Sequence, residues 1–260
     1  MSRNFELLQN LGKEQDIFQA DLEPVMSSPI PAPAMAVPMA EVELTPLQLK
    51  MDETQRDELA KVVQRLFLVP GADAAHVVVV AGTESGSGCS WMCARMAEML
   101  ASQIASPVCV VDANLTSPGL HQQFQTENSQ GLADALRDPE SIRKFAGRVA
   151  RENLWLLTSG ADSAGWQNLI SSDRMRARIA ELRREFHYVL IDAPALNVTN
   201  HGVVLGHAAD GVVLVIKANS ARREIARKAV QELESAQVRI LGAVLNQRAF
   251  PIPQGLYNKL

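Results

Sequence analysis

The chain has 260 residues, of which 47% are hydrophobic and 21% charged, and it carries a formal net charge of −4 at pH 7. This length predicts one large globular domain plus a tail. The charge balance is mildly acidic, so it provides no basic surface for nucleic acid and argues against a nucleic-acid-binding protein.

Two segments precede the predicted domain. Residues 1–22 contain a short amphipathic pattern, which predicts a helix too small to be stable alone. Residues 23–50 are rich in proline, alanine and methionine, and this composition predicts an extended linker. The folded domain is predicted over residues 51–250, and residues 251–260 form a C-terminal tail.

The domain is predicted to begin with a helix over residues 54–68, for which Asp52 or Thr54 is available as the cap. Apolar strand-like runs then alternate with helical ones. Strands are predicted at 76–82, 107–112, 154–158, 187–192, 211–217 and 239–246, and helices near 90–105, 131–146, 172–186, 199–208 and 221–236. Strands that are apolar on both faces and separated by helices predict an α/β fold: a doubly wound, mostly parallel sheet with helices on both faces. The glycine-rich run at residues 85–90, between the first strand and the next helix, makes this fold the P-loop NTPase type.

The sequence also indicates where the protein resides. No apolar run approaches the roughly 18–20 residues that span a bilayer, and the first residues lack the apolar core of a signal peptide. The three cysteines, Cys89, Cys93 and Cys109, lie on predicted internal elements and do not form a spaced disulfide framework. We therefore expect a cytoplasmic protein in a reducing compartment.

A glycine-rich loop follows the first predicted strand and opens a helical stretch, which is the context of a phosphate-binding loop. Its lysine is missing, because Cys89 stands where the cation is needed. Charge-assisted hydrogen bonds contribute roughly 1.5–3 kcal/mol each, so their loss weakens phosphate binding by about one to two orders of magnitude. The candidate cofactor-binding residues are Ser85, Gly86, Ser87, Gly88, Cys89, Ser90, Trp91 and Asn246. The sequence leaves open whether ATP or ADP and Mg²⁺ bind.

Two aspartates end apolar strands at the same predicted edge of the sheet. Asp112 follows the second strand and Asp192 a later one. An aspartate in such a position needs a partner, and together with the Ser90 hydroxyl the two carboxylates form a candidate Mg²⁺ site. The alternative is that the two aspartates cap the helices or turns that follow them.

Several runs resemble the bacterial tyrosine kinases that control capsule and exopolysaccharide export. The matching runs are 110–115, 118–121, 186–194, 209–215 and 241–246, within a resemblance that covers about 55–248. The resemblance implies that the loop and the two aspartate strands bind ATP and Mg²⁺, with Asp112 and Asp192 as the catalytic residues. It also implies that Asn246 contacts adenine and that a tyrosine cluster in the tail is phosphorylated by a neighbouring subunit. The wider superfamily includes the partition-type ATPases.

The chain departs from the family pattern where the chemistry takes place. Asn114 stands in place of a second aspartate, and Thr116 in place of an arginine. Glu84 takes the position of the extra lysine of the partition-type ATPases, and Tyr257 is the one tyrosine of the tail and a candidate phosphoacceptor. Asparagine cannot act as a general base, so these changes predict impaired catalysis.

Two positions keep alternative interpretations. The Cys89 thiol at a helix N-terminus is either a reactive group with a lowered pKa or a residue that replaced the lysine and has no role of its own. Trp91 either fills part of the nucleotide pocket or packs between helix and sheet.

The resemblance and the departures together predict a catalytically impaired homologue that acts as a regulatory or scaffold module in exopolysaccharide or capsule biosynthesis. Its expected partner is a membrane-bound polysaccharide co-polymerase, an adaptor or an active kinase homologue. Binding to such a partner would place the protein at the inner face of the membrane. Two alternatives remain: an active kinase that recruits Lys217, Arg222 or a partner's arginine, and a partition-type positioning ATPase.

Overall fold

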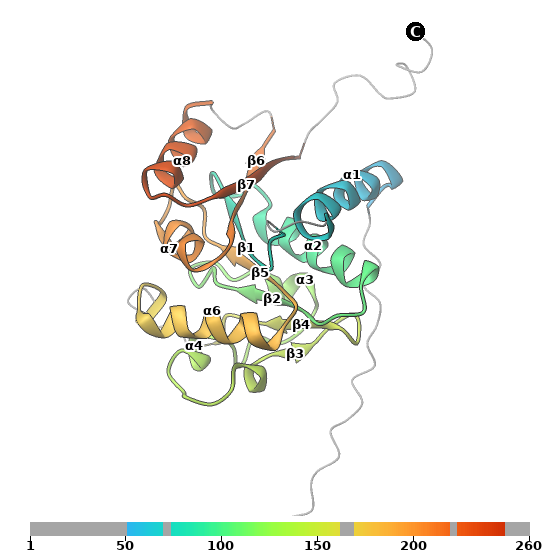
Figure 1. Cartoon of the computed structure of the whole chain (residues 1–260), viewed down its shortest axis with the longest axis vertical. Helices are drawn as coiled ribbons and strands as arrows, with labels where there is room; N and C mark the ends of the chain where they lie inside the picture. Colours follow the sequence, from blue (N-terminus) through green and yellow to red (C-terminus); the bar gives the residue numbers. More distant parts are fainter. Residues whose placement is uncertain (1–50, 70–73, 162–168, 219–222, 248–260) are drawn as a thin grey trace, which may run out of the picture. The chain divides into compact units, whose positions relative to one another are not determined.

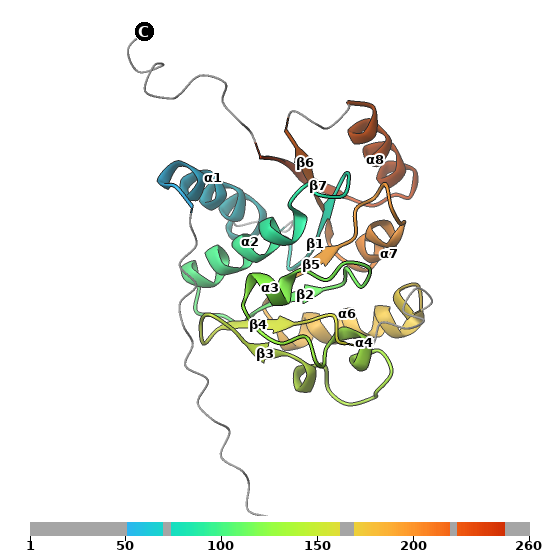
Figure 2. The same ribbon diagram turned by 180° about the vertical axis from the view of Figure 1, so that it is seen from behind.

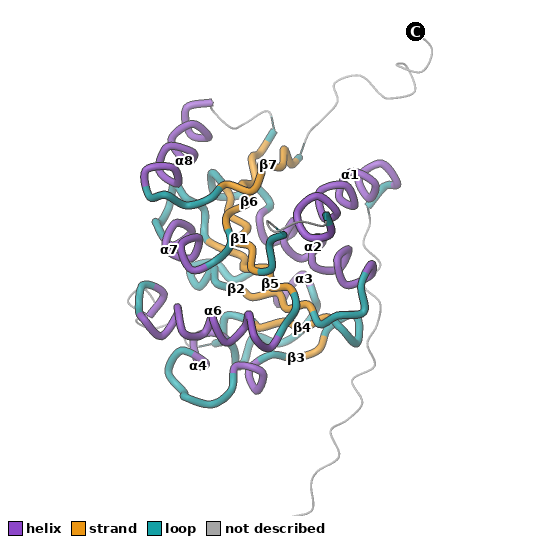
Figure 3. The backbone as a smooth tube through the Cα atoms, in the orientation of Figure 1, coloured by secondary structure: helices purple, strands orange, loops and turns teal. Residues whose placement is uncertain are grey.

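The structure of the protein is a computed structural model. A seven-stranded sheet lies at its centre, and the strand order of the sheet is β3-β4-β2-β5-β1-β6-β7 (Figure 3). The strands are β1 (Val77–Gly82), β2 (Val108–Asp112), β3 (Gly147–Arg148), β4 (Leu154–Leu157), β5 (Tyr188–Ala193), β6 (Gly211–Lys217) and β7 (Ile240–Asn246). Every neighbouring pair is parallel except β3 with β4. The predicted mostly parallel sheet is confirmed, while the two-residue edge strand β3 was not predicted.

The structure describes residues 51–69, 74–161, 169–218 and 223–247. All of them belong to one compact unit, Glu43–Leu260. The predictions for residues 1–22, 23–50 and 251–260, and those for Arg222 and Tyr257, lie outside the described residues. Within the described ranges, no helix is long and apolar enough to cross a membrane.

Helices cover both faces of the sheet (Figures 1 and 2). One face carries α1 (Glu53–Val63), the π-helix η1 (Gln64–Leu68), α2 (Cys89–Gln103) and α3 (Leu120–Gln123). The other carries α4 (Leu132–Ala135), the 3-10 helix η2 (Ile142–Phe145), α6 (Asp173–Glu185), α7 (His201–Ala208) and α8 (Arg223–Ser235). Two hydrophobic cores result, one on each side of the strands.

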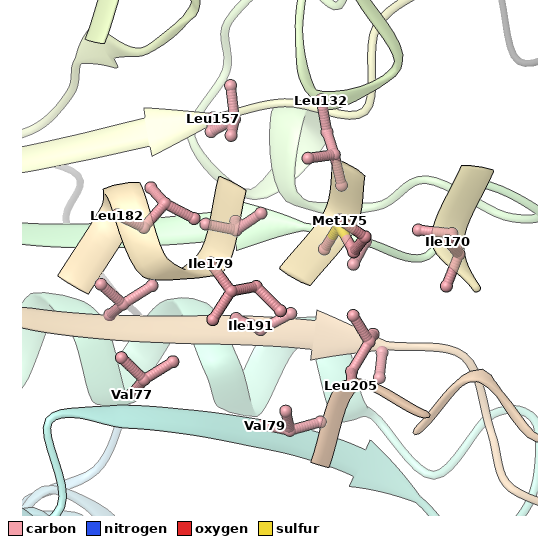
Figure 4. Close-up of a cluster of buried hydrophobic side chains, with 14 of the residues drawn as sticks. Val77, Val79, Leu132, Leu157, Ile170, Met175, Ile179, Leu182, Ile191 and Leu205 are labelled. Carbon is pink, nitrogen blue, oxygen red and sulfur yellow. The ribbon is translucent and has the colours of Figure 1, made fainter. Parts of the chain in front are cut away.

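The central strands are buried on both faces, as their unbroken apolar sequences predict. Alternate residues of β1 point into different cores: Val77 and Val79 into one, and Val78 and Val80 into the other. Figure 4 shows the first of these cores, where Val77 and Val79 lie near Ile191 of β5 and the inward side chains of α6.

Two sequence predictions about helices have different outcomes. The helix predicted over 54–68 is present as α1 and η1, and Asp52 caps it by accepting the N–H of Gln55 at 2.7 Å. The single helix predicted over 131–146 is wrong, because the structure has two short helices, α4 and η2, on either side of Pro139. Proline lacks an N–H and clashes with the preceding turn, so the helix cannot continue through it.

A buried ion pair joins two residues of α2. The Arg95 guanidinium donates to the Glu98 carboxylate at 2.9 Å and to the Gln123 side chain of α3 at 3.1 Å. The two charged residues are only 3% and 7% exposed. Burial raises the pKa of Glu98 and lowers that of Arg95, while each charge partly offsets this effect on the other. Each charge therefore depends on its partner.

Removal of one partner should strongly destabilise the fold. Glu98→Ala leaves the Arg95 charge buried without its counter-ion, and we expect the free energy of unfolding to fall by about 3 kcal/mol in urea titrations followed by circular dichroism. The matched control is Glu58→Ala on α1, whose ion pair with Lys61 (2.7 Å) is exposed, and it should leave the unfolding midpoint unchanged. Equal effects of the two substitutions would contradict this account.

Candidate functional site

The loop between β1 and α2 has a shape that its glycines dictate. Gly86 and Gly88 have φ angles of +76° and +80°, a left-handed region that favours glycine. A Cβ on Gly88 would lie 2.4 Å from Asn246 Nδ2, and a Cβ on Gly82 would lie 2.2 Å from Ser87 Oγ. Substitution at these glycines would therefore displace the loop.

The loop leads directly into the N-terminus of α2, which begins at Cys89. The N–H of Met92 donates to Gly88 O at 2.9 Å, which leaves the N–H groups of the preceding residues without acceptors inside the helix. These N–H groups and the helix dipole make the end of α2 suited to an anion such as a phosphate. The shape and the polarity of the predicted phosphate-binding loop are both present.

The Cys89 side chain points toward the sheet. Its thiol donates to Val80 O at 3.2 Å and lies 3.9 Å from Ala193 O. Burial raises the pKa of the Cys89 thiol well above its ordinary value, and the nearby Asp192 carboxylate raises it further. The raised pKa argues against the interpretation of Cys89 as a reactive thiol with a lowered pKa.

Asp112 and Asp192 lie side by side as register partners on β2 and β5, and both are fully buried. The Asp112 carboxylate accepts the N–H groups of Gly119 and Leu120 at 3.0 Å each and that of Asn114 at 3.2 Å. Asp112 therefore does hold the turn that follows its strand and the start of α3, as the capping interpretation predicted. Burial raises its pKa, and these hydrogen bonds lower it in part.

Asp192 is in a different environment. Within the described residues neither of its carboxylate oxygens accepts a hydrogen bond of ordinary geometry. Burial and the neighbouring Asp112 raise its pKa to about 7, although Ser90 and Cys89 lie close enough to lower it in part. Its two buried oxygens without partners, beside the Ser90 hydroxyl, fit a hard cation such as Mg²⁺, which prefers oxygen ligands.

The end of β7 holds the loop from the side. The Asn246 amide donates to Ser87 O at 2.9 Å, and the Gln247 amide donates to Gly86 O at 3.3 Å. Both bonds fix the loop backbone without any phosphate. The adenine contact of Asn246 stays a prediction, and the role of Gln247 was missed because no spacing in the sequence places it beside the loop.

The remaining predicted site residues lie around the loop and the two aspartates. The Asn114 side chain accepts the Thr116 hydroxyl at 2.8 Å and the Ser117 N–H at 3.3 Å, so it stabilises its own turn. Trp91 is partly buried against the core below α2, and the Arg95 guanidinium lies 5.8 Å from its ring centre. These contacts favour the packing interpretation of Trp91. Ser85 is exposed in the loop.

A glycine loop between a buried parallel strand and a helix, with buried aspartates at the ends of neighbouring strands, defines a P-loop α/β protein. The bacterial tyrosine kinases and the partition-type ATPases belong to this class. A family model described as Cellulose biosynthesis protein BcsQ matches residues 75–240, more than half of the chain. The chain belongs to this family.

Individual relatives agree with this assignment. Tyrosine-protein kinase YwqD of Bacillus subtilis (strain 168) is 31% identical over 169 residues, which are 65% of this chain and 71% of YwqD. The crystal structure of the chimerical protein CapA2B2 has a TM-score of 0.71 and 22% identity, over 78% of this chain and 88% of that one. The ParA family ATPase from Chlorobium tepidum TLS has a TM-score of 0.55 and 22% identity, over 67% and 75%. The resemblance to the bacterial tyrosine kinases is confirmed, and the two structures show the fold alone.

The raised pKa of Asp192 predicts a pH-dependent loss of stability. An unfolded aspartate has a pKa of about 3.9, so from about pH 4 to 7 the folded protein holds a proton that the unfolded chain has released. Stability contributed by this group should therefore fall as the pH rises through that window. We expect Asp192→Asn to exceed the wild type in unfolding free energy by on the order of 2 kcal/mol at pH 8 and by little at pH 4, in urea titrations with EDTA.

Asp210 provides a matched control of opposite sign. Burial raises its pKa, but Arg183 and the N–H groups of His76 and Val77 outweigh this effect and hold the pKa below the ordinary value. Asp210→Asn should therefore lower stability at pH 8, where the carboxylate is charged. A stability of Asp192→Asn that follows the wild type at every pH would disprove the account of Asp192.

The amide of Asn246 should restrain the loop in the absence of any ligand. Asn246→Ala removes the hydrogen bond to Ser87 O, which stabilises the loop by about 1 kcal/mol. We expect amide hydrogen exchange in residues 86–88 to accelerate by roughly fivefold. Exchange in β4, which lies on the far side of the sheet from β7, should not change. Unaltered exchange in the loop would show that the glycine backbone alone holds it.

Proposed function

We propose that this protein is a catalytically impaired homologue of the bacterial tyrosine kinases, which acts as a regulatory or scaffold module in the biosynthesis and export of an exopolysaccharide such as cellulose. The observation that carries the proposal is the position of Cys89. At the place where the kinases have their loop lysine, a neutral thiol donates to a strand carbonyl below the loop. Residue 89 therefore provides no positive charge that could stabilise a phosphoryl group during its transfer.

The two aspartates support the same conclusion. Phosphoryl transfer to a tyrosine needs a carboxylate that accepts the hydroxyl proton, as well as charge on the metal ligands. The Asp112 carboxylate already accepts three backbone N–H groups, which hold it in the turn after its own strand. Asn114 provides no second acid, and its side chain is used in its own turn. The site therefore keeps the shape of a kinase site and lacks the charges that transfer needs.

The family and its relatives support the proposed setting. The family description concerns cellulose biosynthesis, and YwqD is described as a tyrosine-protein kinase. We infer that the module acts in the cytoplasm and reaches the inner face of the membrane by binding a polysaccharide co-polymerase, an adaptor or an active kinase homologue. A protein that keeps the fold but has lost the charge of its loop suits such a role, because it can bind a partner through its surface without catalysing phosphoryl transfer.

Restoration of the lysine tests the proposal. The wild type should show no ATP-dependent tyrosine phosphorylation of itself or of an active homologue. Cys89→Lys should bind Mg-ATP roughly ten- to a hundredfold more tightly than the wild type, as measured by calorimetry, because it returns the charge to the loop. Cys89→Met is the matched control, since it replaces the thiol by a long neutral side chain and should give no gain.

Phosphorylation by the wild type that Asp192→Ala abolishes would overturn the proposal in favour of an active kinase. Failure of Cys89→Lys to gain affinity would show that loss of the lysine is not what disables the loop.

A further inference from the structure

A lysine lies beside the loop at the end of β6. In the sheet β6 is located between β1, which leads into the loop, and β7. Lys217 is the last residue of β6 and the register partner of Asn246 on β7. Neighbouring strands are about 4.8 Å apart, so Lys217 lies one strand nearer to the loop than Asn246 does. Even from that greater distance, Asn246 reaches Ser87 O.

The Lys217 side chain also leaves the sheet on the face where the loop enters α2. Along β6, Val213 and Val215 point into the core below α2, whereas Val212 and Leu214 point into the opposite core. Strand alternation places Lys217 on the same face as Val213 and Val215. This is also the face from which Asn246 contacts the loop.

The charge on Lys217 is uncompensated in the described structure. Its ammonium forms no hydrogen bond or ion pair with another described residue, although the side chain is partly buried. Arg95 on α2, by contrast, is buried and already paired with Glu98. A partly buried lysine that has no counter-ion among the described residues, next to a loop shaped for phosphate, matches a polyanionic ligand.

We propose that Lys217 supplies the positive charge that the loop lacks, and that it binds the phosphate groups of a nucleoside polyphosphate from the end of β6. This inference deepens the proposed function, because it gives the non-catalytic module a nucleotide as a ligand. The lysine approaches from the strand edge instead of from the first turn of α2. It therefore stabilises bound phosphate without taking the position that the transfer reaction requires.

Calorimetry on the full-length protein tests the assignment, with Mg-ATP and with inorganic tripolyphosphate as separate probes. The wild type should bind both, and Lys217→Met should weaken both by roughly tenfold or more. Lys217→Arg keeps the charge and should stay within about threefold of the wild type. The matched control is Lys228→Met: Lys228 is an exposed lysine of α8 on the opposite face of the sheet, and its substitution should change neither affinity.

Several outcomes would overturn the inference. They are unchanged tripolyphosphate binding by Lys217→Met, equal losses in Lys217→Met and Lys228→Met, and a wild type that binds neither probe. Lys217→Gln provides a second neutral variant, and thermal unfolding followed by circular dichroism confirms that each variant is folded. A wild type that binds neither probe leaves the proposed scaffold function intact. Tyrosine phosphorylation by the wild type would overturn the scaffold function, while a loss of binding in Lys217→Met would still support the role of Lys217.

Discussion

The register of the parallel strands determines where every polar group of the site lies. Because the strands run in one direction, their carboxyl ends meet at one edge, where Asp112 pairs with Asp192 and Gly82 pairs with Val215. This register brings together the loop after β1, the two aspartates and the ends of β6 and β7. Residues separated by more than 150 positions, such as Gly86 and Gln247, come into contact as a consequence.

Burial sets the pKa values of the carboxylates at this edge of the sheet. A carboxylate at the end of an apolar strand loses its hydration, and the loss favours the neutral acid unless donors or a cation compensate for it. At Asp112 three backbone N–H groups provide part of that compensation. Asp192 has no comparable donors among the described residues, and burial together with the neighbouring Asp112 raises its pKa to about 7. The two neighbours thus differ in the same buried setting, and Asp192 is the one left with oxygens for a ligand.

The fold could be predicted from the sequence because its strongest signals are local. Runs such as Val77–Gly82 are apolar on both faces, and this places buried strands to within about one residue. The strand β3 has only two residues, too few for any periodicity, and Pro139 interrupts the helical pattern that misled the prediction over 131–146. The sequence also predicted that the glycine loop, Asp112 and Asp192 lie at one edge of the sheet, and the structure places them there. The direction of the Cys89 thiol and the contact of Gln247 could not be predicted, because they depend on which strands become neighbours.

In a P-loop the lysine combines two roles that this structure separates. One role is shape: the loop must keep its glycines in left-handed conformations so that its N–H groups converge. Here the amides of Asn246 and Gln247 bind the carbonyl oxygens of Ser87 and Gly86, so the loop keeps its shape without a phosphate or a lysine. The other role is charge, which Cys89 cannot supply. A loop with its shape fixed and its charge absent can still recognise a phosphate once a cation approaches from a neighbouring strand, but that cation then lies on a strand and not in the first turn of α2. In a usual P-loop, phosphate binding and phosphoryl transfer both depend on the same lysine. In this arrangement a protein can lose phosphoryl transfer and still bind phosphate.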